Sequence, residues 1–455
     1  MKFTLSFTTT YLLFGISYCI AINENSDSTI DISKQENIRR IPTHIIKFKA
    51  PSIKNITGFE STAFVEQHYK TFQEGLKSSL KGKHVLMSDM SQTSDEDMKL
   101  ESLKDIQIGD NYRALTGSFH PQFVNYLSNI DDIEFIEQNQ IYKAPFIPPT
   151  VDPKIYMQDI IHKVPNSKTK RGIVTQVDVP SWGIARINHR ELRDLTVYTT
   201  DDTAGTGIHV YILDSGINES HPDFEGRALM EANFISYEDS GDFSGHGTHV
   251  AGIIGGKAFG VAKKSFLHGI KILDRNGDGT TSALLQAISY IVETHEPGHS
   301  IINLSLSGPR SSSIDEALSM VVQDYDIPVF VSAGNTGDDA CAYSPSANPD
   351  VFAIGATNYQ DIIPSFSSFG KCVSIYAPGA NITSDWLENK TITMDGTSMA
   401  SPHVSGIAAM LMSKTKFESP NDLYTMIKNM GTPNILKPSD KAQGALLAYN
   451  GLDHL

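Results

Sequence analysis

Three polar residues whose types suit nucleophilic catalysis lie in glycine-bordered turns beside apolar runs. Asp214 lies in Ile-Leu-Asp-Ser-Gly, His246 in Gly-His-Gly-Thr-His, and Ser398 in Gly-Thr-Ser-Met-Ala. A serine hydroxyl is a weak nucleophile at neutral pH, so it needs an imidazole to take its proton and a carboxylate to orient that imidazole. The three residue types therefore predict acyl transfer through a covalent intermediate on Ser398.

An asparagine supplies a fourth candidate group. The apolar run at 329–332 is followed by Ala333, Gly334 and Asn335. Acyl transfer places negative charge on the substrate carbonyl oxygen, and a side-chain amide together with a backbone N–H group stabilises that charge. We therefore expect Asn335 and the backbone N–H of Ser398 to form an oxyanion hole. The alternative is that these residues only cap helices and turns, and their combination makes it the weaker explanation.

The elements that must position these groups are those of an α/β domain with a parallel sheet. Short apolar segments predict strands at 208–213, 266–272, 301–306, 328–332, 351–356 and 373–377. Helical patterns alternate with them at 246–255, 282–294, 312–325 and 398–413. The catalytic candidates then fall at strand ends or helix starts along one edge, where open α/β sheets bind their ligands.

The chain order Asp214, His246, Ser398 is the subtilisin order. In these segments the sequence resembles the subtilisin-like serine peptidases, most closely the proteinase K branch with its fungal vacuolar and secreted members, over residues 180–415. The resemblance implies a three-layer α/β/α fold and serine endopeptidase activity. An esterase of the α/β-hydrolase type is disfavoured, because its serine comes first in the chain and lies in Gly-x-Ser-x-Gly.

The resemblance also assigns substrate binding. Extended substrate is expected to pair with the segment that matches the family's Ser-Leu-Gly-Gly sequence, which consists of Ser305, Leu306, Ser307 and Gly308. The opposite wall of the specificity pocket is expected to be formed by Ala333 and Gly334. Ser307 replaces a glycine, and we expect it to narrow the cleft. Asp395 stands where serine or asparagine is usual, and its carboxylate is expected to raise the reaction barrier or shift the pH optimum.

These two departures keep a second function class open. The alternative to an active endopeptidase is a weakly active or inactive subtilase-fold protein that binds or supports a wall or matrix. The complete set of catalytic groups favours the enzyme.

The N-terminal part of the chain indicates a leader and a propeptide. Residues 1–21 fit a signal peptide, and 22–171 fit a propeptide with a core at 41–144 and a proline-bearing linker at 145–179, before a peptidase domain at 172–455. Strands expected at 43–48, 112–119 and 133–138 alternate with helices at 61–79 and 121–128. This order resembles the inhibitory propeptide of subtilases, which implies that the propeptide assists folding and then plugs the cleft with its tail. An unrelated α+β binding domain is the alternative.

Two maturation sites are compatible with the sequence. A dibasic-specific protease would cleave after Arg171 in Lys-Thr-Lys-Arg, whereas self-cleavage would occur later, near Thr175 to Pro180. The predicted leader directs the chain into the secretory pathway, towards the cell exterior, the wall or a vacuole.

Composition limits the partners. The net charge of −15 argues against nucleic acid. After the leader no segment is apolar enough to cross a bilayer, so no membrane association is expected once the leader is removed. The expected partners are polypeptide substrates and the chain's own propeptide, acting as an intramolecular inhibitor of a monomer.

Covalent modifications follow from the predicted compartment. Cys341 and Cys372 remain after the leader and are expected to form a disulfide, with two buried thiols as the alternative. Glycosylation is expected at the sequons that begin at Asn55, Asn218, Asn381 and Asn389. Asn303 also begins a sequon, but it lies in a predicted central strand and should stay unmodified.

No metal or cofactor is predicted. Asp274 and Asp278 suggest a calcium loop, but Leu285 occupies the position that should supply the bidentate glutamate. His246 and His249 have no third ligand beside them in the sequence. The resemblance carries no calcium site either, because Ser374 stands where proteinase K has an aspartate ligand, so calcium dependence is left open.

Overall fold

The computed structural model describes residues 41–50, 60–81, 100–144, 147–149, 172–437 and 444–452. The predicted signal peptide, the sequon at Asn55 and most of the linker lie outside these residues. Among the helices that are described, none is both long and apolar enough to span a membrane.

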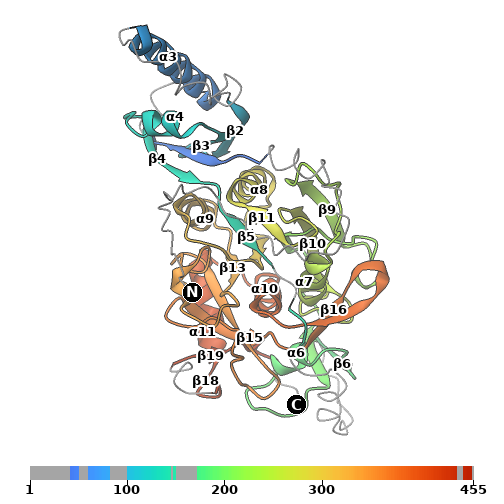
Figure 1. Cartoon of the computed structure of the whole chain (residues 1–455). Helices are drawn as coiled ribbons and strands as arrows, with labels where there is room; N and C mark the ends of the chain where they lie inside the picture. Colours follow the sequence, from blue (N-terminus) through green and yellow to red (C-terminus); the bar gives the residue numbers. More distant parts are fainter. Residues whose placement is uncertain are drawn as a thin grey trace, which may run out of the picture. The chain divides into compact units, whose positions relative to one another are not determined.

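A nine-stranded sheet forms the centre of the C-terminal part (Figure 1). In spatial order its strands are β18 (Thr432–Pro433), β19 (Leu446–Leu447), β15 (Val373–Pro378), β14 (Phe352–Thr357), β13 (Val329–Ser332), β12 (Ser300–Leu304), β8 (His209–Asp214), β10 (Phe266–Lys271) and β9 (Ala228–Asn233). All neighbours pair in parallel except β18 and β19. Because helices cover both faces of a parallel sheet, its central strands are mostly buried and apolar, as predicted.

The helices pack as two groups against this sheet. The helix α7 (His246–Gly255) packs against α10 (Thr397–Met412), and α8 (Thr281–Thr294) packs against α9 (Ser312–Asp324). A further helix, α11 (Pro420–Met430), contacts α10. The predicted α/β/α layers are confirmed, and the predicted helices and central strands agree with the observed bounds to within two residues.

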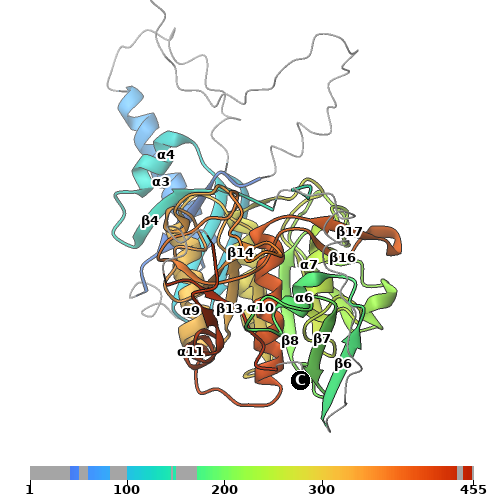
Figure 2. The same cartoon turned by 90° about the horizontal axis from the view of Figure 1, so that it is seen from below.

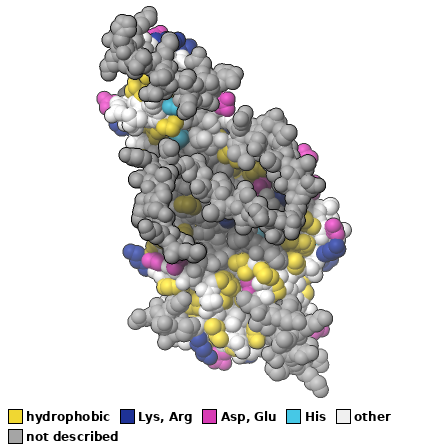
Figure 3. Space-filling view, in the orientation of Figure 1, with side chains coloured by type: hydrophobic (Ala, Val, Ile, Leu, Met, Phe, Trp, Pro, Cys, Tyr) yellow, Lys and Arg dark blue, Asp and Glu magenta, His cyan; other side chains and the backbone are white. Residues whose placement is uncertain are grey.

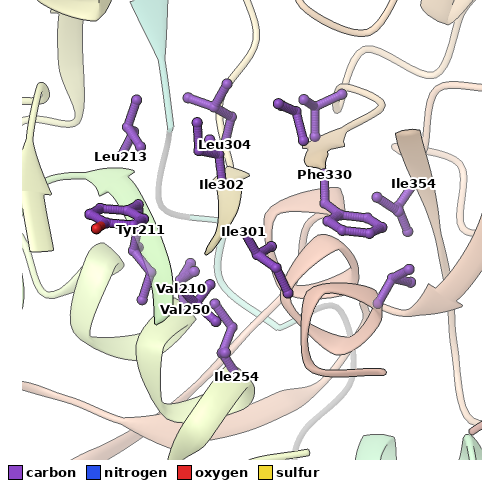
Figure 4. Close-up of a cluster of buried hydrophobic side chains, with 14 of the residues drawn as sticks. Val210, Tyr211, Leu213, Val250, Ile254, Ile301, Ile302, Leu304, Phe330 and Ile354 are labelled. Atoms are coloured by element: carbon purple, nitrogen blue, oxygen red, sulfur yellow. The ribbon is translucent and has the colours of Figure 1, made fainter. Parts of the chain in front are cut away.

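The core lies between the sheet and the helices. Figure 4 shows Val210 of β8 beside Val250 and Ile254 of α7, while Phe330 of β13 lies beside Ile354 of β14. All five side chains are at most 1% exposed. Alternate residues of a strand face opposite sides of the sheet, so these apolar runs can bury both faces at once.

The N-terminal part forms a separate four-stranded antiparallel sheet in the order β2 (Glu101–Ile108), β3 (Tyr112–Ser118), β1 (His44–Phe48) and β4 (Ile133–Gln138). Two helices, α3 (Ser61–Lys81) and α4 (Pro121–Leu127), accompany it. Its own core contains Phe48 and Phe123, which are fully buried. The predicted strands and helices are confirmed, and β2 is an addition that its polar sequence did not reveal.

The linker is shorter than predicted. Residues 173–177 form the strand β6 (Ile173–Val177), which pairs antiparallel with β7 (Val197–Asp201), as Figure 2 shows. Val179 is buried, and the helix α6 (Trp182–Arg186) follows. The prediction of an extended linker up to Val179 is therefore wrong for its last residues, because they pair with β7 as a strand.

The predicted disulfide is present. It joins Cys341 and Cys372, whose Cα atoms lie 5.4 Å apart.

Charged side chains are mixed on the face drawn in Figure 3, where the described Lys and Arg residues are scattered and form no basic patch.

Candidate active site

The end of β8 and the start of α7 bring an aspartate and a histidine together. Nδ1 of His246 lies 2.8 Å from Oδ1 of Asp214, and both side chains are buried. Burial by itself lowers the pKa of His246, but the carboxylate of Asp214 outweighs this effect and raises the pKa above its usual value. Because the carboxylate fixes the Nδ1–H tautomer, Nε2 is left as the atom that can accept a proton.

The serine lies in the first turn of α10 but does not bond to this imidazole. Its Oγ donates to the backbone oxygen of Ser305 at 3.0 Å, and Ser305 Oγ donates to the backbone oxygen of Ser398 at 3.0 Å. Nε2 of His246 is buried and has no hydrogen-bond partner among the described residues. A change of the Ser398 rotamer is therefore needed before the hydroxyl can donate to His246, and such a loose arrangement is common in enzymes without substrate.

Asn335 is held with its amide group oriented. Its Oδ1 accepts hydrogen bonds from the backbone N–H and from the hydroxyl of Thr397, each at 2.8 Å. A backbone N–H can only donate, so the atom that faces it must be the oxygen, and Nδ2 stays available to donate. Thr397 Oγ1 also accepts from the backbone N–H of Gly334 at 3.2 Å. Thr397 was not predicted, and its only signal in the sequence was its place directly before Ser398.

A strand from the N-terminal part runs antiparallel beside the predicted substrate-binding segment. The strand β5 (Ile141–Lys143) pairs antiparallel with β11 (Asp278–Thr280) on one side. On the other side Lys143 and Ser307 exchange backbone hydrogen bonds of 3.0 and 3.2 Å. The next residue, Ala144, donates to the backbone oxygen of Gly277 at 2.9 Å. Both backbone bonds at Ser307 thus form, and the prediction that its side chain narrows the cleft stays a prediction.

A cavity of about 640 Å³ lies beside this strand and reaches the serine. Its lining includes Leu306, Gly308, Gly334, Asn335 and Ser398. Gly334 has φ +106°, and a Cβ atom there would lie 3.1 Å from Ser368 Oγ, so a side chain at this position is disfavoured. Most predicted substrate-binding residues thus line one cavity. The exceptions are Ser305, which bonds to Ser398, and the fully buried Ala333.

Asp395 holds a turn of the backbone. Its carboxylate accepts a hydrogen bond of 2.7 Å from the backbone N–H of Asn381, and the side chain is 1% exposed. The backbone N–H of Asp395 donates to the backbone oxygen of Ile147 at 3.0 Å. These contacts give the unusual residue a structural role, and its effect on rate or pH optimum stays a prediction.

The predicted glycosylation sites differ in accessibility. Asn389 is exposed and Asn218 is half-buried, so both side chains can be reached. Asn381 is 1% exposed, and its prediction as a glycan site is therefore wrong for the folded chain. Asn303 is fully buried and accepts hydrogen bonds from the hydroxyls of Ser401 and Ser405.

No three His, Cys, Asp or Glu side chains of the described residues are arranged to hold a metal. In the segment that suggested calcium, Asp274 Oδ1 accepts backbone hydrogen bonds from Asn276 and Asp278 at 2.8 and 3.1 Å. The loop is thus closed by its own backbone, and the segment continues into β11.

Comparison with known proteins adds independent observations. Residues 205–446 match the model of the family described as "Subtilase family". The chain is 37% identical over 353 residues to Subtilisin-like protease 6 of Arthroderma gypseum, a match that covers 76% of this chain and 79% of the relative. It is 40% identical over 284 residues to the Cuticle-degrading protease of Metarhizium anisopliae, covering 62% of this chain and 72% of the relative. The crystal structure of a cold adapted subtilisin-like serine proteinase matches with a TM-score of 0.57 and 34% identity, covering 60% of this chain and 98% of that one.

Proposed function

Because the chain belongs to the subtilase family, we propose that it is a serine endopeptidase that uses Ser398 as nucleophile, His246 as general base and Asp214 as the group that orients His246. The observation that carries these roles is the 2.8 Å bond between His246 Nδ1 and Asp214, which leaves Nε2 free. Asn335 is assigned to the oxyanion hole because Thr397 fixes its amide with Nδ2 available.

Substrate binding is proposed to release the nucleophile. A substrate strand that pairs with Ser307 as Lys143 does places the residue two positions further on opposite Ser305, because antiparallel pairing proceeds in register. The backbone N–H of that residue then competes for the Ser305 carbonyl oxygen, which Ser398 Oγ occupies in this structure. Once displaced, the hydroxyl can turn to His246.

The chemistry then follows from these groups. Ser398 Oγ attacks the substrate carbonyl carbon while its proton passes to Nε2 of His246, and Asn335 Nδ2 with the Ser398 N–H binds the oxyanion. The imidazolium, stabilised by Asp214, gives its proton to the leaving amine, and an acyl-enzyme remains. Water attacks the ester with His246 as base, and the serine is regenerated.

We also propose that the N-terminal domain is an intramolecular inhibitor. Its tail residues Ile141–Lys143 lie as a strand in the substrate segment. Its body contacts the start of two peptidase helices: Glu137 accepts from the Ser312 N–H at 3.1 Å in α9, and Asn139 accepts from the Ser282 N–H at 2.9 Å in α8. Uncapped N–H groups at helix starts favour such acceptors, so these contacts support a matched pair of domains.

A buried charge supports the same pairing. Lys47 of β1 is 1% exposed, and its Nζ lies 2.9 Å from Glu316 of α9 and 3.1 Å from Glu134 of β4. A buried cation is tolerated only when it is paired. A domain that bound this chain by chance would have no reason to place a lysine opposite Glu316, so the pair supports a domain that is specific for the helix α9.

Maturation after Arg171 fits the fold better than later self-cleavage. A cut between Thr175 and Pro180 would divide β6 or remove it, although its residues pair with β7 from Ile173 to Val177. N-terminal sequencing of the mature enzyme tests this: a start at Gly172 supports dibasic processing, whereas a start beyond residue 175 contradicts it. Passage through the secretory pathway to the exterior, the wall or a vacuole, as a monomer that needs no metal or cofactor, belongs to the same proposal.

The alternative class, an inactive binding protein, has one observation in its favour, namely that Ser398 bonds to Ser305 and not to His246. Intact mass after treatment with a fluorophosphonate serine probe decides between the two. An endopeptidase gains one adduct that Ser398→Ala lacks, and it hydrolyses peptide substrates. A folded wild-type chain that has been freed of its N-terminal domain and still takes no adduct would establish the binding protein.

A further inference from the structure

An acidic residue outside the triad holds the start of the helix that carries the base. Oδ1 of Asp242 accepts hydrogen bonds from the backbone N–H groups of Ser244 and Gly245, at 3.0 and 2.8 Å. Its Oδ2 accepts from the N–H and the hydroxyl of Thr248, at 3.0 and 2.6 Å. Helix α7 begins at His246, and its N-cap residue Gly245 has no side chain to bind these donors. Asp242 therefore does the work of a helix cap from a position outside the helix.

The same carboxylate also ties the helix to the segment that follows Asp214. Ser215 Oγ donates to Asp242 Oδ1 at 2.8 Å and accepts from the backbone N–H of Gly247 at 3.0 Å. The hydroxyl of Thr248, which donates to Asp242, accepts from the backbone N–H of Asn218 at 2.9 Å. Asp242 is thus bonded, directly or through one hydroxyl, to the chain beside both His246 and Asp214.

The two segments lie too close together for a side chain at Gly247. A Cβ atom at Gly247 would lie 2.0 Å from the backbone oxygen of Gly216 and 3.2 Å from Cβ of Asp214. Hydrogen bonds to an ionised acceptor are stronger than those between neutral groups, so a carboxylate is well suited to hold this contact.

We propose that Asp242 is a positioning residue for catalysis, which sets the distance and orientation between His246 and Asp214. This inference rests on the proposed peptidase function. The negative charge of Asp242 has a second effect, because it favours the imidazolium and adds to the rise in the pKa of His246 caused by Asp214.

The other ionisable groups near this contact are accounted for. His249, further along α7, stays neutral because burial lowers its pKa to about 3. Lys271 of β10 donates to the backbone oxygen of Ser215 at 2.9 Å and pairs with Glu238 at 3.1 Å. The charges that act on His246 in opposition to its burial are therefore those of Asp214 and Asp242.

Asp242→Asn in the full secreted enzyme tests the proposal. The amide keeps an oxygen for Ser215 and Gly245 but presents N–H groups to Thr248 and removes the charge. We expect kcat per probe-reactive site to fall about 10- to 100-fold with KM nearly unchanged. We also expect the acid limb of the kcat/KM profile to move to lower pH, which loss of structure alone would not cause.

Asp201→Asn is the matched control. Asp201 Oδ1 also accepts backbone hydrogen bonds in a loop, from Thr203 and Ala204 at 2.9 and 3.0 Å, and its other oxygen pairs with Lys414. None of these partners bonds to a triad residue. We expect Asp201→Asn to lower the melting temperature without moving kcat per active site or the pH profile.

Thr248→Val separates geometry from charge, and it remains informative should Asp242→Asn not fold. It removes the hydroxyl that bonds to Asp242 and Asn218 but keeps the carboxylate. We expect kcat to fall with the acid limb unmoved. Unchanged kcat in Thr248→Val, or Asp242→Asn with the kcat and pH profile of the wild type, would overturn the proposal. A wild-type chain that has been freed of its N-terminal domain and still shows no probe reaction would instead refute the peptidase function itself.

Discussion

Ser398 and Ser305 exchange hydrogen bonds, since each hydroxyl donates to the backbone oxygen of the other residue at 3.0 Å. The hydroxyl of the proposed nucleophile therefore donates to the same Ser305 carbonyl oxygen to which a substrate strand is expected to donate. Productive binding and release of the hydroxyl become one event. A ligand that fills the cavity without offering an N–H to Ser305 would leave the serine where it is.

A substrate that lacks this N–H should be bound but turned over slowly. Methylating the backbone nitrogen of the substrate residue opposite Ser305 removes the donor. We expect kcat to fall about 10-fold or more, because a hydrogen bond of about 1.5 kcal/mol is lost. The comparison is with the same peptide methylated two residues earlier, opposite Ser307, which should mainly raise KM. Equal effects on kcat at the two positions would contradict the coupling.

Removing the oxyanion donor should slow the chemical step. We expect Asn335→Ala to lower kcat about 10²- to 10³-fold while KM changes little, because the amide binds charge that exists only in the transition state. Thr397→Val removes one of the two bonds to Asn335 Oδ1 and keeps the backbone bond, so its effect should be smaller. Steady-state kinetics on one peptide anilide measures both. A larger loss in Thr397→Val than in Asn335→Ala would exclude this assignment.

Activity should depend on the protonation of His246. Because Asp214 holds the pKa of His246 above its usual value of about 6.5, the imidazole becomes protonated, and useless as a base, as pH falls through that raised pKa. We expect an acid limb in kcat/KM with its midpoint above pH 6.5. Asp214→Asn should fold, as circular dichroism can verify, but lose about 10⁴-fold in kcat. An active Asp214→Asn enzyme would refute the role of the carboxylate.

A buried acid should make stability fall with rising pH. Asp385 is fully buried, and burial, with a further contribution from the negative charge of Asp223, raises its pKa to about 9. The carboxyl group of Asp385 ionises near pH 4 in the unfolded chain and near pH 9 in the folded chain. Between these values the folded chain binds the extra proton, so the free energy of unfolding decreases as pH rises. Asp385→Asn should remove this slope and stabilise the protein at pH 8 by about 1–3 kcal/mol.

Calorimetric melting between pH 5 and pH 9 measures this effect. The exposed Asp239 provides the control, because Asp239→Asn removes the same charge from the surface. If both variants change stability equally at pH 8, the effect belongs to net charge and not to the buried site.

Opening the disulfide should affect stability more than catalysis. Cys341 and Cys372 are separated by 31 positions, and closing a loop of this length stabilises a protein by about 2–4 kcal/mol. We expect the double variant Cys341→Ser, Cys372→Ser to melt at a lower temperature with an unchanged kcat per probe-reactive site. A matching loss of kcat would show that this loop also shapes the neighbouring cavity.

The sequence predicted elements best where burial and local signals agreed. Helix α7 starts at His246 as predicted, because Gly245 stops the preceding turn and the following residues are uniformly buried. The strand Glu101–Ile108 was missed, because an edge strand with polar residues lacks the apolar run that marks a central one. The triad itself could be predicted because each member lies in a distinctive short segment.

Contacts between distant polar residues could not be predicted. Asp242 acts through backbone N–H groups, which have no signature in the sequence. Asp223 raises the pKa of Asp385 only because the fold brings these two residues together from distant parts of the chain. The rotamer of Ser398 is equally invisible, since it depends on which acceptor lies nearest. Residue types therefore predicted the chemistry, whereas the tertiary structure alone supplies the groups that orient it.

The pairing of β6 with β7 has a consequence for the purity of the mature product. Gly172 is followed at once by a strand bonded along its whole length, and its own carbonyl oxygen accepts from the N–H of Asp202 at 3.0 Å. An aminopeptidase that meets the end left by cleavage after Arg171 finds no loose residues to remove. The fold would thus give every molecule the same first residue, even in a compartment rich in exopeptidases.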